Sequence, residues 1–79
     1  MSDAKVGDRV VDSRGRVIGR VDAVYADYLL VRTGGLLPVD LYVPRPQVIR
    51  MDERRLQVPM TSAQAYEAWH RPLRRAPHD

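Results

Sequence analysis

Residues 6–25, VGDRVVDSRGRVIGRVDAVY, decide the fold expected for this chain. Val10 and Val11 form a short extended run, and several β-branched residues after Gly15 form a second one. Such side chains suit a half-buried pleated strand. Between the two runs, residues 13–16 (SRGR) have the composition of a turn, because Ser can bond the nearby backbone and Gly accepts a positive φ. The stretch therefore predicts a β-hairpin.

The second strand of this hairpin alternates imperfectly between apolar and polar residues. One face would carry residues 17, 19, 21, 23 and 25, which leaves Ile18 and Val24 on the other face. One extra residue in a strand switches the face of everything before it, so we expect a β-bulge at Gly19. A glycine there also allows a sharp bend or the close approach of another strand. The simplest interpretation is a curved hairpin that binds no ligand.

The hairpin resembles the opening of the PRC-barrel superfamily, which is named for the H subunit of the photosynthetic reaction centre. Residues 28–33 (YLLVRT) and 42–44 (YVP) continue the likeness, and residues 56–59 (LQVP) are similar to the end of one group of short bacterial members. The positions that carry the resemblance are Gly7, Asp12, Gly15, Gly19, Val21, Val24 and Pro44. The resemblance implies a small barrel that acts as a docking module in larger assemblies.

Two segments depart from the family pattern. Only Ala26 and Asp27 stand where members often have a longer acidic connection, and residues 45–47 (RPQ) are charged and stiff where members are often apolar. A partner surface built from these loops would differ in this chain.

The rest of the chain continues with short extended segments and ends with one helix. Strands are expected at residues 28–32, 39–43, 48–51 and 55–58, separated by Gly- and Pro-containing turns. Thr61 and Gln64 form a capping box, which predicts a helix over about 62–70. The fold class is therefore mainly β: a small, curved, mostly antiparallel barrel of about six short strands with one C-terminal helix. We expect residues 1–5 to be a flexible lead, 6–70 the domain and 71–79 a mobile basic tail.

Composition limits the functional classes. The chain has 79 residues, enough for one domain with a small core, and it contains no Cys, which excludes disulfides and thiolate chemistry. No apolar run reaches the length of a membrane span, and the N-terminus lacks the apolar core of a signal peptide. We therefore expect a cytoplasmic protein.

No residue pattern indicates catalysis. His70 and His78 have no second ligand at metal-binding spacing, and the ten carboxylates are scattered along the chain. General acid–base chemistry needs a carboxylate with a shifted pKa in a cleft. We expect no enzyme, no cofactor and no bound metal, and we expect a protein-docking or self-associating module instead.

The partner contact is expected on apolar residues near a sheet edge. Two consecutive leucines beside a loop suggest a flap over the barrel end or a contact with another chain, and an open edge strand offers unpaired backbone groups. Trp69 is expected to pack on the barrel, with a partner contact as the alternative. The candidates for contact, including that of a homodimer, are Leu36, Leu37, Val39, Leu41 and Trp69.

Nucleic-acid binding is the alternative function. The net charge is +3, and 12 of the 13 basic residues are Arg, which reflects either anion recognition or a compositional bias. Tyrosines 25, 28 and 42 would supply stacking surfaces. The candidate contacts are Arg14, Arg16, Arg20, Arg32 and Tyr28, together with the basic tail. Interspersed acidic residues and the absence of a nucleic-acid-binding motif favour the docking function.

Overall fold

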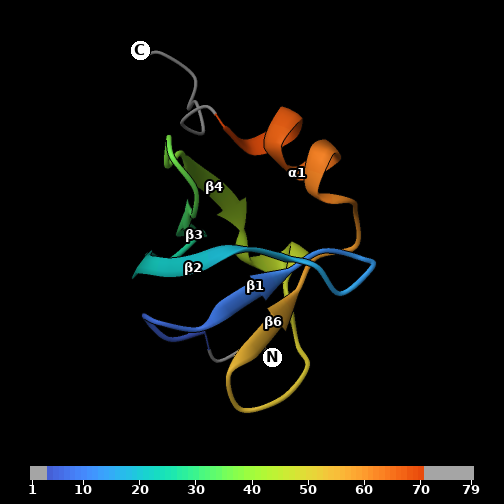
Figure 1. Cartoon of the computed structure of the whole chain (residues 1–79). Coiled ribbons are helices and arrows are strands. Elements are labelled where there is room, and N and C mark those ends of the chain that lie inside the picture. Colours follow the sequence, from blue (N-terminus) through green and yellow to red (C-terminus); the bar gives the residue numbers. More distant parts are fainter. Residues whose placement is uncertain (1–3, 71–79) are drawn as a thin grey trace.

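The computed structural model describes residues 4–70, which form a curled sheet and one helix (Figure 1). The elements in chain order are β1 (Arg9–Val11), β2 (Val17–Val24), β3 (Tyr28–Thr33), β4 (Asp40–Pro44), the 3-10 turn η1 (Arg45–Gln47), β5 (Ile49–Arg50), β6 (Arg55–Gln57) and α1 (Ser62–Trp69). The mainly β fold with a short C-terminal helix is confirmed. The first three residues of the expected lead and the expected tail, 71–79, lie outside the described residues.

The six strands form a single sheet in the order β4-β3-β2-β1-β6-β5. Neighbouring strands are antiparallel except β1 and β6, which run parallel and pair Arg9 with Arg55 and Val10 with Leu56. The sheet curls into a half-barrel, and β4 and β5 are its two edges. β5 has only two residues, so β4 is the longer open edge.

The core fills the concave side of this half-barrel. Its buried members come from five strands, from Val48 and Val58 and from the helix. Helix α1 packs against β4 and closes one end of the half-barrel (Figure 1). Ala65 and Trp69 face this core, while Ala68 is exposed. The core residues are Val10, Val21, Leu29, Val31, Leu41, Val43, Val48, Leu56, Val58, Ala65 and Trp69.

β2 contains two irregularities that set the direction of its side chains. Against β1, the register steps from Gly19 to Val17, so Ile18 is the extra residue beside the glycine, and its side chain packs against the core. The expected bulge is therefore present. A second step follows Val21 in the pairing with β3, and Val24 at the strand end stays 36% exposed.

Gly19 is required by the close approach of β3. A Cβ atom at this position would overlap the Arg32 carbonyl oxygen, so any side chain here would force the backbone of β3 to move. The expected role of Gly19 in allowing a neighbouring strand to approach is confirmed.

Asp12 joins the hairpin turn to the helix. Its side chain is buried, and Oδ1 accepts hydrogen bonds from the amides of Arg14 and Arg16, both at 2.9 Å. Oδ2 accepts bonds from the Ser62 amide at 3.0 Å and the Ser62 hydroxyl at 2.8 Å. Burial raises the pKa of Asp12, but these four hydrogen bonds outweigh it and lower the pKa from 3.8 to about 2.

The helix begins and β4 ends as the sequence predicts. Thr61 Oγ1 accepts a bond from the Gln64 amide, and Gln64 Oε1 accepts one from the Thr61 amide, which is the expected capping box. Pro44 is the last residue of β4, and η1 follows it. Of the helices in residues 4–70, none is long and apolar enough to cross a membrane.

Candidate functional site

Four arginines form a row across the outer face of the sheet. The Cα register pairs Arg55 on β6 with Arg9 on β1, Arg9 with Arg20 on β2, and Arg20 with Arg32 on β3. Each is exposed, and each lies next to a core residue in its own strand, so the two-residue period directs all four away from the core. With strands about 4.8 Å apart, the row is about 14 Å long. We call these four residues the arginine row.

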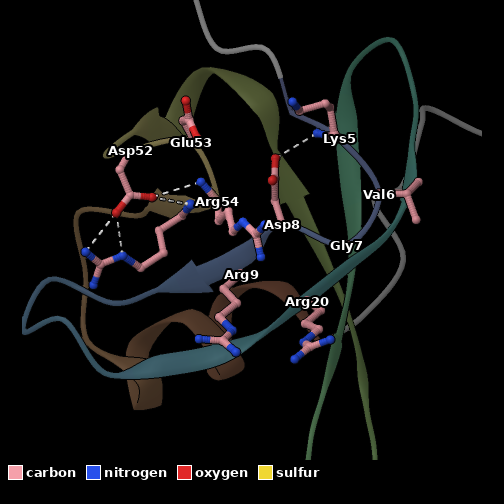
Figure 2. Close-up of a pocket in the computed structure, with 10 residues that line it drawn as sticks. Lys5, Val6, Gly7, Asp8, Arg9, Arg20, Asp52, Glu53 and Arg54 are labelled. Carbon is pink, nitrogen blue, oxygen red and sulfur yellow. Dashed lines mark hydrogen bonds and ion pairs between the residues drawn. The ribbon is translucent and has the colours of Figure 1, made fainter.

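The two middle members of the row face each other most closely. The Val21 amide donates to the Asp8 carbonyl at 2.8 Å, the pattern that flanks a non-hydrogen-bonded pair, so Arg9 and Arg20 form a pair of that kind. Side chains are closest in such pairs. Figure 2 shows both guanidinium groups extending from β1 and β2 in the same direction. Within residues 4–70, neither side chain has a hydrogen-bond or ion-pair partner.

The outer members of the row each have an acidic partner. Arg32 Nε lies 3.2 Å from Asp40 Oδ1, and Arg55 Nη2 lies 2.8 Å from Asp52 Oδ2. The Arg54 amide and the Arg55 side chain lower the pKa of Asp52. The row is therefore neutralised at its two ends and uncompensated in the middle.

A groove of about 810 Å³ lies along one half of the row (Figure 2). The β5–β6 turn forms one wall, and the chain leading into β1 forms the other. A second groove of about 600 Å³ continues over Arg32 toward Gly34, and it shares Val6, Gly7 and Arg20 with the first. Together the grooves follow the whole row across β6, β1, β2 and β3.

The acidic residues of these grooves are partly engaged within the fold. Asp8 Oδ2 accepts bonds from the Lys5 amide at 2.9 Å and from Arg50 Nη2 at 2.7 Å, and Asp52 is held by Arg54 and Arg55. Asp22 and Glu53 are the exposed acidic members of the lining that remain. Asp8 is thus directed to donors outside the row, whereas Asp52 is held by Arg55 at one end of the row.

Three tyrosines gather on the same outer face. Tyr25 stacks on Tyr28 with ring centroids 4.7 Å apart, and Tyr28 lies 5.8 Å from Tyr42. Tyr28 and Arg32 share a face of β3, and Tyr42 lies two residues along β4 from Asp40, the partner of Arg32. Tyr28 lies four residues along β3 from Arg32, so these three tyrosines, the tyrosine cluster, share the outer face with the arginine row and are centred about 13 Å along β3 from Arg32.

The structure separates the arginines that the sequence grouped together. Arg20 and Arg32 are in the row, but Arg14 and Arg16 are exposed residues of the β1–β2 turn, where their amides bond Asp12. Arg9 and Arg55 were missed. Arg9 could have been found from its alternation with Val10, whereas Arg55 enters only through the parallel pairing of β6 with β1.

An apolar surface lies near Val17, the first residue of β2. Leu36 is 100% exposed and Leu37 is 84% exposed, and Leu37 lines a groove of about 440 Å³ together with Val17, Ile18 and Tyr66. We call Leu36, Leu37, Val17 and Tyr66 the leucine surface. Of the other candidates for partner contact, Val39 is half-buried against the core, and Leu41 and Trp69 are core residues that a partner cannot reach.

Two features of residues 4–70 bear on metal binding and on acid–base chemistry. Residues 4–70 contain no cluster of three or more His, Asp or Glu side chains that could hold a metal ion. The carboxyl with the most strongly shifted pKa, Asp12, is 1% exposed, and both of its oxygens are engaged. A substrate cannot reach it.

Comparison with protein-family models, with curated proteins and with solved structures finds no match for this chain. The PRC-barrel resemblance stays a prediction.

Proposed function

We propose that this chain is a non-enzymatic binding module of the cytoplasm that associates with a second copy of itself through the leucine surface. The observation that carries the proposal is the exposure of Leu36 and Leu37 beside an apolar groove. An apolar patch of this kind is a common sign of a protein contact. The docking role that the PRC-barrel resemblance implies agrees with it.

A second copy suits this surface because the exposed Leu36 and the apolar groove lined by Leu37 are adjacent. A two-fold axis between them would place Leu36 of each copy in the groove of the other. Such a contact is isologous: one surface serves both partners, and the assembly closes as a dimer. The half-buried Val39, which precedes β4, also lines the groove, so the edge strand β4 borders the same contact and offers backbone groups for pairing.

The free energies of leucine burial and of association predict a weak dimer. Burying the four leucines of two copies would contribute about 6–12 kcal/mol, at about 1.5–3 kcal/mol for each side chain. Association costs about 4–15 kcal/mol in lost translational and rotational freedom. At the favourable end of these ranges burial exceeds the cost by about 4–8 kcal/mol, which corresponds to a dissociation constant in the millimolar to micromolar range.

Sedimentation velocity across that concentration range tests the proposal. The wild type should shift from monomer to dimer as concentration rises, whereas the variant Leu36→Glu/Leu37→Glu should stay monomeric because each interface would bury charge. The variant Ile49→Glu/Met51→Glu is the matched control. It adds the same charge at exposed apolar residues near β5, the opposite edge of the sheet, and it should dimerise like the wild type. A wild type that stays monomeric throughout, or a control that dissociates equally, would overturn the proposal.

A further inference from the structure

The register of the sheet places Arg20 between two other arginines. Arg9 is directly opposite it on β1, and Arg32 is directly opposite it on β3. Like charges in directly opposed positions of a sheet destabilise it. The fold itself gains nothing from this arrangement, because Arg9 and Arg20 have no internal partner within residues 4–70.

Carboxylates that could compensate the charges of Arg9 and Arg20 are present in the same groove. Asp8 precedes Arg9 in the chain, but its carboxylate is buried and bonded to the Lys5 amide and to Arg50. Asp52 lines the same groove and holds Arg55. The middle of the row is therefore an exposed, uncompensated pair of guanidinium groups in an open groove.

We propose that the arginine row binds the phosphates of a single-stranded nucleic acid, whose bases reach the tyrosine cluster. Guanidinium groups match phosphate oxygens with two parallel hydrogen bonds, and a negative strand would relieve the repulsion between Arg9 and Arg20. The grooves form a continuous track along the row, which suits an extended chain of phosphates.

The tyrosines favour a single strand over a duplex or an acidic peptide. Tyr25 is 45% exposed and stacked on Tyr28, and an exposed aromatic ring on the same face as a basic track can stack a base. Bases inside a duplex cannot reach such a ring, and the acidic side chains of a peptide carry no aromatic ring that could stack there. Val17 of the leucine surface also lines the second groove, so the two sites border each other, but Leu36 and Leu37 line neither groove of the row.

Fluorescence anisotropy with a labelled single-stranded 12-mer, a length within the site sizes of about 4–16 nucleotides known for small barrels, tests the inference. The full chain should bind at about 50 mM salt and lose affinity by about 200 mM, with log K linear in log salt. The variant Arg9→Gln/Arg20→Gln should weaken binding by about tenfold or more, because it removes two charge-assisted contacts. Its salt slope should be shallower by about 1.4, at about 0.7 for each phosphate contact on a single strand.

The variant Arg14→Gln/Arg16→Gln is the matched control. It removes the same charge from the same hairpin but lies outside the row, and its side chains make no bond within residues 4–70. It should lose about twofold at most if binding is local to the row. Asp22→Asn should strengthen binding, because it removes an acidic group from the groove.

The results that would overturn the inference differ from those that would overturn the dimer. Absence of binding at low salt, or equal losses in the two double-arginine variants, would show that no site exists on the row. Tighter binding of poly-glutamate or of duplex DNA at matched charge would exclude the single-stranded ligand. The variant Leu36→Glu/Leu37→Glu should still bind the 12-mer, as a monomer. Its affinity should equal that of Ile49→Glu/Met51→Glu, which carries the same added negative charge.

Discussion

Asp12 and Arg20 belong to the same hairpin, but one charge is buried among hydrogen-bond donors and the other is exposed between two like charges. The Asp12 carboxylate accepts four hydrogen bonds that connect the β1–β2 turn to the start of α1. The Arg20 guanidinium extends from the outer face with an arginine on each side. One arrangement stabilises the fold, and the other opposes it.

This difference separates structural from functional charge. Burying a carboxylate without hydrogen-bond partners would cost free energy of folding, and the fold supplies two donors for each oxygen of Asp12. An exposed guanidinium costs little in water, so it can be kept without an internal partner and remains available to a ligand. We therefore assign Asp12 to the architecture and propose the arginine row for binding, although Asp12 and Arg20 are both charged residues of one hairpin.

The largest effect should come from Asp12→Ala. The change removes four acceptor interactions and leaves the amides of Arg14, Arg16 and Ser62 without their partner, so the turn and the helix start both lose their fixed positions. We expect it to lower the melting temperature, followed by circular dichroism, more than a substitution of any exposed residue of the arginine row or the leucine surface.

Asp22→Asn is the control for that change. Asp22 is an exposed residue of β2, and surface substitutions of this kind shift stability by about 0.5 kcal/mol or less. If Asp12→Ala melted at the temperature of Asp22→Asn, the hairpin and the helix would not depend on the buried carboxylate.

Acid should reproduce part of the Asp12 effect. The pKa of Asp12 is lowered in the folded chain to about 2 from 3.8, so the folded state binds this proton less readily than the unfolded state. Its contribution to stability is complete above pH 3.8 and declines as the pH falls to about 2. The melting temperatures of the wild type and of Asp12→Asn should therefore converge below pH 3.8.

The contribution of Asp52 to the acid-dependent loss of stability must be separated from that of Asp12, because the pKa of Asp52 is lowered as well. The variant Asp52→Asn should keep most of the acid-dependent loss, since Asp52 lies in an exposed turn. A difference between wild type and Asp12→Asn that stayed constant down to pH 2 would contradict the assigned role of the Asp12 carboxylate.

Local patterns predicted most of this fold. The turn at residues 13–16, the bulge beside Gly19, the capping box of Thr61 and Gln64 and the end of β4 at Pro44 each depend on neighbouring residues. The parallel pairing of β1 with β6 was not predicted, since the sequence indicated mostly antiparallel neighbours. Two short strands far apart in the chain carry no local signal of which strand each will pair with.

The candidate site was harder to predict for the same reason. Proximity in the chain grouped Arg14 and Arg16 with Arg20, but a turn and a strand direct their side chains to different places. Register brings Arg9 and Arg55 to Arg20 instead. The alternation of residues 39–43 correctly placed Leu41 on an apolar face, and that face is the core rather than a partner surface.

The smallest effect is the most specific to the arginine row: Arg9→Gln/Arg20→Gln should be as stable as the wild type or more stable. Removing a directly opposed pair of like charges should add about 0.2–1 kcal/mol to the free energy of unfolding. Urea unfolding followed by circular dichroism measures the change.

Salt provides the control for this last change. Raising ionic strength from about 0.1 M to 1 M shortens the Debye length from about 10 Å to 3 Å, so it should stabilise the wild type more than the variant. A loss of more than about 1 kcal/mol in the variant would mean that the arginine stems pack on the sheet and stabilise it. A variant that is more stable and binds nucleic acid less would instead show that the row is maintained against the stability of the fold, as expected for residues whose partner is outside the chain.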